Sequence, residues 1–203
     1  MKSHILARSD AFRDLHSGVR QAELTGLPIY RQVMGAVFDR LPPKVRALHD
    51  STEERVWRGT AKVERGKGVL NRLVARIFGF PEGTEKTDVE VRFSPEGDSE
   101  VWTRTFGTKQ FRSVQRVVQR REAFVIVERF GWIDIALALA VEDDRLMIVP
   151  RHWRVLGIPL PKFLMPGGST YETDLNGRFH FNVEITAPLL GLIVSYRGEL
   201  GPA

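Results

Sequence analysis

Apolar and polar residues alternate along most of the chain beyond residue 88, and this two-residue period predicts antiparallel β-strands joined by tight turns. An earlier alternating segment, 55–65, predicts one more strand. The longest apolar strand is expected at 132–141. The best hairpin signal is Asn176-Gly177, because both residues tolerate the positive φ angles of a type I′ turn. We expect a sheet of about eight strands.

Helical spacing is confined to three shorter segments. A helix is expected after Pro28, which suits an early helical position, and it should end at Pro42-Pro43, where a second short helix begins. Apolar residues then recur at helical intervals from Leu70 to Phe78, which predicts a helix directly after the first strand. Residues 1–26 have weak periodicity and are expected to form a peripheral extension to one domain at 27–203.

Consecutive antiparallel strands of this length twist, and a flat open sheet would expose unpaired edges. The predicted fold class is therefore α+β, mainly antiparallel β. We expect a strongly curved sheet or half-barrel, a lipocalin-like cup, with the helices across its open side or mouth.

Composition and charge limit the possible chemistry. The chain has no cysteine, which excludes disulfides, thiol catalysis and cysteine-ligated metals. No apolar run approaches the ~20 residues of a membrane-spanning helix, and a signal peptide is not evident, so a cytoplasmic location is expected. The net charge is +5, with fifteen Lys or Arg against eight Asp or Glu in residues 55–121. This basic section indicates either an anionic partner or an ordinary solvated surface, and we favour the latter.

Several short segments together resemble a bacterial family catalogued as domain of unknown function 4166. They lie at 30–42, 78–81, 102–107, 111–113, 156–161, 177–181, 188–192 and 196–198, so the resemblance covers about residues 27–200. The family name implies no activity, substrate or catalytic residue. The resemblance does imply a partner, because similar domains occur at the C-terminal end of longer chains whose N-terminal part resembles a nicotinamide-dependent oxidoreductase.

One face of the strand at 132–141 carries Trp132, Asp134 and a row of small residues, Ala136, Ala138 and Ala140. Such a face leaves room for a close-packed helix or for a bound ligand. Asp134 is a candidate for a perturbed pKa if it is buried. The alternative, which we favour, is a strand-end carboxylate that reaches water or a neighbouring arginine.

A proline-rich apolar segment at 156–166 is neither a regular strand nor a solvated loop. With Leu160, Phe163 and Met165 it could form a flap over a cavity, or an apolar tip that enters a membrane surface beside Lys162. The simpler alternative, an irregular cover over one end of the core, is slightly favoured. His180 lies on the polar face of its strand, which faces either solvent or a lined cavity.

Basic residues offer a second kind of candidate surface. Lys67, Arg72 and Arg76 lie opposite the apolar stripe of the helix at 68–78, so this helix could rest on an anionic membrane. More often such a helix packs its stripe on the sheet. On the strands, Arg104, Arg112 and Arg116 could bind phosphate groups, but nucleic acid is not expected, because exposed aromatics are not interleaved with them.

Three hypotheses follow, and the first is preferred. The chain is a non-enzymatic binder of a hydrophobic ligand such as a lipid, acyl chain or isoprenoid; an accessory module for an oxidoreductase or an anionic membrane surface; or an enzyme that uses Asp134, His180 or Glu184. The binder predicts an interior cavity of at least ~300 Å³, lined by Ala136, Ala138 and aromatic residues. The sequence contains no recognised catalytic, metal or cofactor motif, so none of these is assigned.

Overall fold

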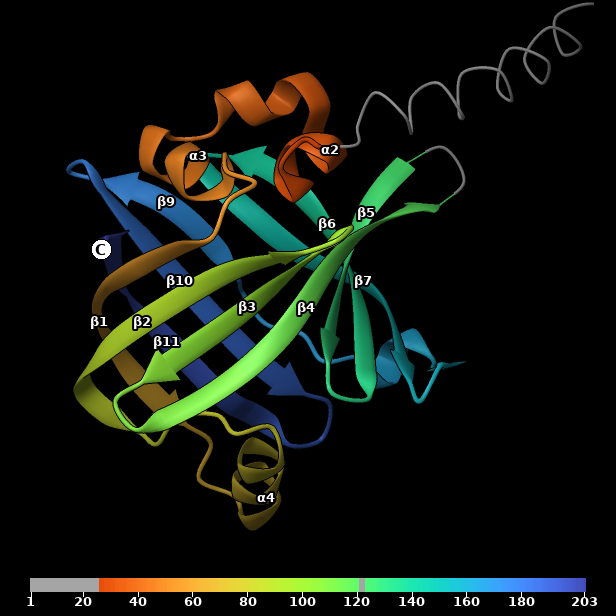
Figure 1. Cartoon of the computed structure of the whole chain (residues 1–203). Coiled ribbons are helices and arrows are strands. Elements are labelled where there is room, and N and C mark those ends of the chain that lie inside the picture. Colours follow the sequence, from red (N-terminus) through yellow and green to blue (C-terminus); the bar gives the residue numbers. More distant parts are fainter. Residues whose placement is uncertain (1–25, 121–122) are drawn as a thin grey trace, which may run out of the picture.

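The computed structural model describes residues 26–120 and 123–203, so almost all of the predicted N-terminal extension lies outside the described residues. The described residues form a closed antiparallel barrel with helices at both ends (Figure 1). Its strands are β1 (Arg55–Arg65), β2 (Thr84–Glu96), β3 (Ser99–Phe106), β4 (Lys109–Arg120), β5 (Ala123–Phe130), β6 (Ile133–Glu142), β7 (Arg145–Val155), β9 (Tyr171–Leu175), β10 (Arg178–Ala187) and β11 (Gly191–Pro202), with the short β8 (Ile158–Pro159) added at the edge of β7.

The ring closes through two pairings between strands that are not consecutive in the sequence. β1 pairs with β2 on one side and with the last strand, β11, on the other. β7 pairs with β6 and also with β9, which joins the two halves of the sheet. The half-barrel of about eight strands is therefore corrected to a barrel closed by ten of the eleven strands in the described residues. Closure leaves no open side, which satisfies backbone groups that an open edge would expose.

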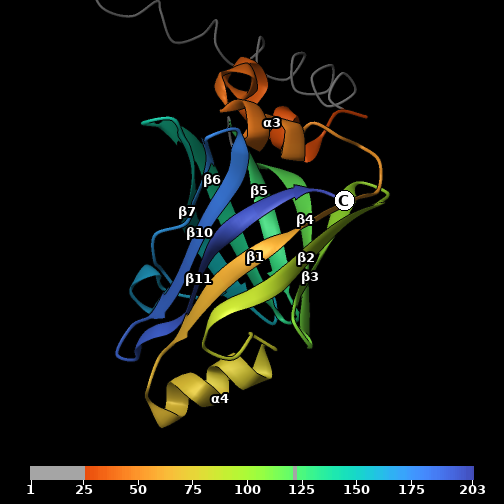
Figure 2. The same ribbon diagram turned by 90° about the vertical axis from the view of Figure 1, so that its left-hand side faces the viewer.

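Three helical segments cover one end of the barrel. They are α2 (Ile29–Met34), the 3₁₀ helix η1 (Gly35–Arg40) and α3 (Pro43–His49). Pro28 and Pro42 are the N-cap residues of α2 and α3, where a missing N–H costs no helical hydrogen bond. These segments lie across the mouth, as expected, and α4 (Val69–Ile77) lies at the opposite end (Figures 1 and 2).

Alternation places the large apolar side chains of every strand inside the barrel. Phe93, Phe179, Ile126 and Leu146 are almost fully buried there. Aromatic rings contact each other across neighbouring strands: Phe106, Phe111, Phe181 and Tyr196 form a chain of ring pairs. The cavity-side face of β6 is the one with Ile135, Leu137 and Leu139, whereas the alanines belong to the other face, on which Ala136 is nevertheless buried.

Glycine permits the close contact between the first and last strands. A Cβ atom at Gly59 would lie 1.8 Å from the carbonyl oxygen of Glu199, and one at Gly198 would lie 2.1 Å from that of Thr60. A side chain at either position would therefore collide with the neighbouring backbone. In the turn between β9 and β10, Asn176 and Gly177 both have positive φ, which confirms the predicted turn.

The last strand returns the chain to the end where the described residues begin. β11 pairs with β1 from Val194 opposite Arg65 to Pro202 opposite Trp57. The N–H of Ala203 then donates to the carbonyl of Val56. The C-terminus consequently lies at the α2–α3 end, away from α4 (Figure 2).

Candidate functional site

The barrel interior contains a cavity of about 160 Å³. Most of its lining is apolar, and Tyr30 and Leu48, from α2 and α3, close it at one end. Besides Tyr30, the aromatic lining residues are Phe93, Trp102, Phe106, Phe130, Phe179, Phe181 and Tyr196. An engineered apolar cavity of roughly 150 Å³ can take up benzene, so this space fits a compact apolar group without rearrangement.

A buried polar cluster interrupts this apolar lining. Arg104 on β3 donates to the hydroxyl of Ser113 on β4 at 2.7 Å and to the carboxylate of Glu128 on β5 at 3.1 Å. The Ser113 hydroxyl also donates to Glu128 at 2.6 Å. The three residues face inward because each occupies an interior position of its strand. Arg104 is thus charge-neutralised inside the protein instead of lying on an outer phosphate-binding strip.

A second polar group lies between this cluster and the helices. The amide of Gln115, which is 2% exposed, hydrogen-bonds to the hydroxyl of Tyr30, and its Oε1 atom has no partner. Burial raises the pKa of Tyr30 well above its ordinary value, and the nearby Glu172 carboxylate raises it further. Tyr30 therefore stays a neutral phenol. The Tyr30 ring stacks on His49 at 3.6 Å between centroids, and His49 contacts Glu172 at 2.6 Å.

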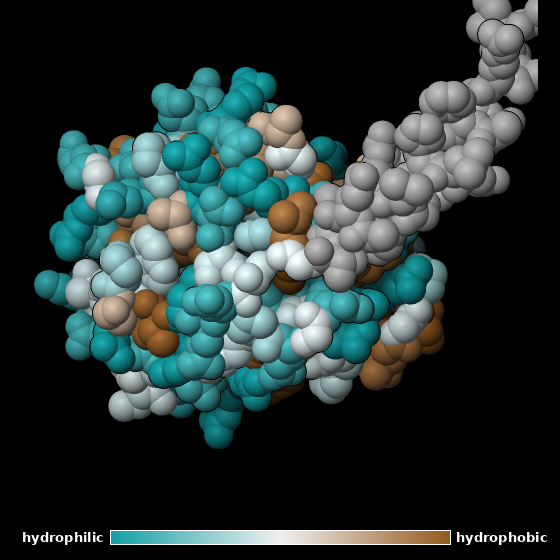
Figure 3. All heavy atoms as spheres, turned by 45° about the horizontal axis from the view of Figure 1, so that its top comes forward, coloured by the Kyte–Doolittle hydropathy of each residue, from teal (hydrophilic) through white to brown (hydrophobic). Residues whose placement is uncertain are grey.

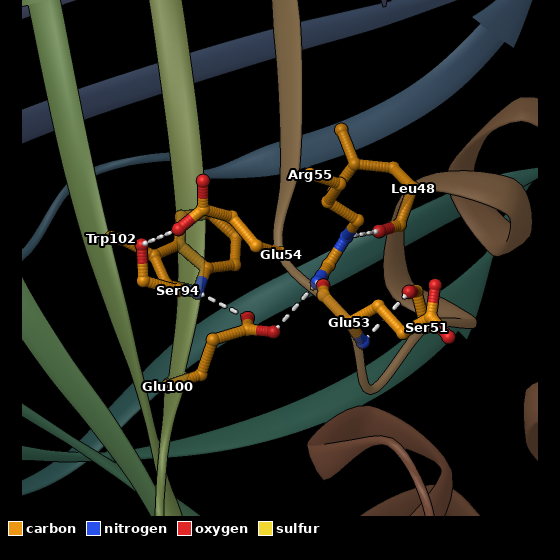
Figure 4. Close-up of polar contacts among 8 residues, drawn as sticks. All are labelled: Leu48, Ser51, Glu53, Glu54, Arg55, Ser94, Glu100 and Trp102. Carbon is orange, nitrogen blue, oxygen red and sulfur yellow. Dashed lines mark hydrogen bonds and ion pairs between the residues drawn. The ribbon is translucent and has the colours of Figure 1, made fainter.

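The helical end is attached to the barrel by a third set of contacts, centred on Arg55 (Figure 4). Arg55 donates to the carbonyl of Leu48 at the end of α3 and to the carboxylate of Glu100 at 2.8 Å. The other oxygen of Glu100 accepts from the Trp102 indole at 2.7 Å. These contacts hold the end of α3 over the interior, so Leu48 keeps its place in the cavity lining.

One side of the cavity is bounded by a non-strand segment, residues 166–170, which we call the strap. It fills the space between β7 and β10, where the ladder of β9 ends. Gly167 exchanges backbone hydrogen bonds with Thr186, and Ser169 accepts from the Asn182 amide. Pro166, Gly167, Gly168 and Thr170 all line the cavity. The strap begins at Pro166, the last residue of the predicted proline-rich segment, so most of this wall lies later in the chain than the sequence indicated.

The residues predicted on strand 132–141 lie outside the cavity. Trp132 is half exposed in the turn before β6, and neither Ala136 nor Ala138 lines the cavity. Asp134 bonds to Arg129 at 2.6 and 3.2 Å, which is the arginine pairing that we favoured. This hydrogen bond holds the pKa of Asp134 below its ordinary value of 3.8.

The other predicted ligand-binding residues are also absent from the lining. Leu160 and Met165 flank the short 3₁₀ helix η2 (Lys162–Leu164), within which Phe163 is exposed. His180 faces outward from β10, 3.7 Å from Glu199. Glu184 does reach the cavity lining, beside the strap. A role of the first four residues in ligand binding stays a prediction.

The predicted basic residues separate into two groups. Lys67, Arg72 and Arg76 belong to α4 or the segment before it, and Lys162 begins η2. Arg112 and Arg116 lie instead on β4 in the barrel wall, with Arg112 3.9 Å from Glu96. The two groups therefore do not form one surface.

Of the strongest polar positions, Gln115 and Glu128 were not identified in the sequence analysis, and Arg104 was considered only as a residue of an outer phosphate-binding surface. Period-2 alternation was a usable signal, since each shares its strand face with buried aromatic or apolar residues. A charged side chain at such a position predicts an internal partner. Within residues 26–120 and 123–203, no three His, Asp or Glu side chains gather to hold a metal ion. No helix in those ranges has the length and hydropathy to cross a membrane.

Comparison with known proteins gives one result. No curated protein matches the chain. The model of one protein family, described as "Domain of unknown function (DUF4166)", matches residues 41–200. This range extends from the start of α3 to Leu200 in β11 and includes the whole lining of the cavity except Tyr30. The match confirms the resemblance seen in the short sequence segments, and the chain belongs to the DUF4166 family.

Proposed function

We propose that the barrel binds a hydrophobic small molecule that is uncharged and carries one hydroxyl or carbonyl group. The observation that carries the proposal is the Gln115 amide, which is buried in an apolar cavity with one atom unpaired. An unpaired buried amide oxygen is costly, and a ligand hydroxyl would satisfy it. If the amide is turned over, its N–H₂ group would serve a ligand carbonyl equally well.

The charges around the cavity favour a neutral ligand over an anion. Arg104 is the cationic side chain among the described lining residues, and Glu128 already neutralises it. Glu172 and Glu184 also belong to the lining. A carboxylate such as that of a free fatty acid would therefore enter a site without an available positive charge, at a high desolvation cost.

The cavity volume sets the size of the ligand. At about 160 Å³ it lies below the ~300 Å³ that the sequence-based hypothesis required. A compact ring or a short branched chain fits directly. A longer acyl or isoprenoid chain would place its polar end here and displace the strap for the remainder.

A three-compound titration tests this proposal. Toluene, benzyl alcohol and benzoate share one ring and differ in the polar group, and Trp102 in the cavity wall provides a fluorescence signal. We expect benzyl alcohol to bind most tightly, toluene less tightly and benzoate most weakly. A hydrogen bond of about 1 kcal/mol should make the alcohol roughly fivefold tighter than toluene.

The matched variants are Gln115→Leu, inside the cavity, and Gln110→Leu, which is exposed on the same strand. Gln115→Leu should remove the preference for the alcohol, and Gln110→Leu should retain it. Equal binding of benzoate and benzyl alcohol, or no binding of any of the three, would overturn the proposal. Native mass spectrometry of the purified protein would then show whether a different molecule leaves with organic extraction.

A further inference from the structure

The α4 end of the barrel gathers exposed apolar side chains from five separate segments. On α4 itself Val69, Leu70, Leu73 and Ile77 are 73%, 58%, 52% and 55% exposed. Exposed residues from the other segments are Trp132 between β5 and β6, Leu156 and Ile158 after β7, Phe163 in η2, and Leu189 between β10 and β11. We call these nine residues the apolar end.

Direct contacts connect these segments to one another. The Phe78 ring meets the Trp132 ring edge-on at 6.4 Å between centroids. Leu156 donates its N–H to the carbonyl of Trp132. On the other side of α4, Asn71 bonds to the carbonyls of Leu190 and Leu192, next to Leu189. The exposed side chains of α4, Trp132, Leu156 and Leu189 therefore lie at one end of the molecule, and η2 with Phe163 follows β8 shortly afterwards in the chain.

The outward direction of the α4 stripe is fixed by a polar anchor. Asn71 is buried and holds the helix on the barrel by donating to two backbone carbonyls, while Ala75 packs beneath it. Gly66 and Gly68 make room for this anchor, because a Cβ atom at either would lie within 2.6 Å of the Asn71 amide. The alternative that we weighed for this helix, burial of its stripe, is met only in part. Val74 and Phe78 pack against the core, whereas Leu70, Leu73 and Ile77 are exposed.

Basic side chains lie on the same elements as the apolar end. Lys67, Arg72 and Arg76 on or before α4 and Lys162 on η2 make no ion pair with any acidic side chain of the described residues. Two acidic side chains close to these segments in the sequence, Glu82 after α4 and Asp134 after Trp132, are already bound to Arg65 and Arg129. The opposite end, at α2–α3, differs: its described surface is mainly hydrophilic, with scattered apolar spots (Figure 3).

From this arrangement we infer that the α4 end docks on an anionic lipid surface, with the apolar end entering the interfacial layer and the four basic residues contacting lipid phosphates. An exposed apolar surface with cations on the same elements matches the two attractions of an interfacial helix, apolar burial and charge. Trp132 is of an aromatic type enriched at this depth, and Phe163 is of a type common on the apolar face of such helices. The docking does not depend on whether the barrel cavity binds a ligand.

Vesicle co-sedimentation of the full chain tests the inference. Vesicles of phosphatidylcholine alone are compared with vesicles that also contain phosphatidylglycerol. We expect binding to the anionic vesicles that weakens with added salt, and a blue shift of tryptophan fluorescence because Trp132 leaves water. Trp132→Phe should lose most of this shift and still sediment.

Substitutions at exposed positions separate docking from folding. Leu73→Gln should weaken binding about tenfold or more, since it removes the burial of one large apolar side chain. Arg72→Gln should weaken it about fivefold, as expected for one basic residue at an anionic surface. The matched controls are Leu175→Gln and Arg40→Gln, which are exposed at the α2–α3 end and should bind like the parent protein.

Two outcomes would overturn the inference. One is the absence of binding to anionic vesicles. The other is an equal loss in the Leu73→Gln and Leu175→Gln variants. Analytical ultracentrifugation of the same proteins identifies the occupant in the first case: a dimer that Leu73→Gln dissociates would assign the apolar end to a second copy of this chain.

Discussion

At the residue scale, the interior of the barrel combines aromatic packing with a small number of buried charges. Arg104 and Glu128 are each almost completely inside, with side chains 12% and 10% exposed, and Ser113 bridges them. Arg104 also lies over the Trp102 ring at 4.7 Å. Removal of one charge leaves the other unpaired in a poorly hydrated place, whereas removal of both leaves only a packing defect.

A double-mutant comparison measures this difference. Glu128→Gln should lower the free energy of unfolding by about 3 kcal/mol, because the Arg104 charge stays buried without its partner. Arg104→Met combined with Glu128→Gln should recover a large part of that loss. Urea unfolding monitored by circular dichroism gives both values. A double variant less stable than Glu128→Gln alone would show that the charge pair is net stabilising.

The residue scale is also where sequence reasoning was least complete. Asp134 behaves as the simpler alternative predicted, because an arginine directly opposite on the neighbouring strand is visible in the alternation of charges. Gln115 and His49 could not be assigned in this way. Their neighbours come from strands and helices more than a hundred positions away in some cases, as with His49 and Glu172. A two-residue period predicts on which face of a strand a side chain lies, but not which residue that side chain contacts.

At the element scale, most strands and the three predicted helical segments follow the hydrophobic pattern, although the first of them divides at Gly35 into α2 and η1. The predicted strand at 55–65 coincides with β1, and the predicted helix at 70–78 differs from α4 by one residue at each end. Strong alternation and well-placed Gly and Pro residues explain this agreement. The segment 156–170 was the exception, because it contains β8, η2 and the strap, each too short to leave a periodic signal.

The strap depends on one glycine, and a pair of substitutions tests it. Gly168 has a φ of +125°, and an added Cβ atom would lie 2.0 Å from the carbonyl oxygen of Glu184. Gly168→Ala should therefore displace the strap, lower the stability by about 1–3 kcal/mol, and open the cavity wall. Thermal unfolding and the association rate of benzyl alcohol report the two effects.

The adjacent glycine is the control. At Gly167 an added Cβ atom would meet the Thr186 hydroxyl at 3.6 Å, an ordinary contact, and the φ angle is not in the left-handed region. Gly167→Ala should leave stability and ligand association nearly unchanged. Equal effects from both alanines would mean that the strap geometry is not what limits access.

At the scale of the whole molecule, closure of the ring was beyond the sequence pattern. Turn residues in the sequence predict the pairing of consecutive strands, but the β1–β11 and β7–β9 pairings join strands that are not consecutive. Loop closure carries an entropy cost that local pattern does not reveal. The prediction of a strongly curved antiparallel sheet was correct, but it contained too few strands and did not include the closure of the sheet into a barrel.

The strand pairings of the barrel differ in length, and amide hydrogen exchange can show the resulting differences in local stability. Strands β7 and β9 pair only through Arg145–Thr173, Leu146–Glu172 and Met147–Tyr171, whereas β1 and β11 pair along nearly their full length. We expect the amides of β9 to exchange through local opening, with protection well below that of β1 and β11. Uniform protection around the barrel would contradict this expectation.

The return of β11 to the α2–α3 end has a practical consequence for handling the protein. Ala203 lies at the end opposite α4 (Figure 2), so a sensor chip or dye coupled through the C-terminus holds the molecule by its hydrophilic end. Every immobilised copy would then present α4, η2 and Trp132 to the solution in the same orientation. Because of the direction of the last strand, the point of attachment and the exposed apolar end lie at opposite ends of the molecule, so all immobilised copies would be oriented alike.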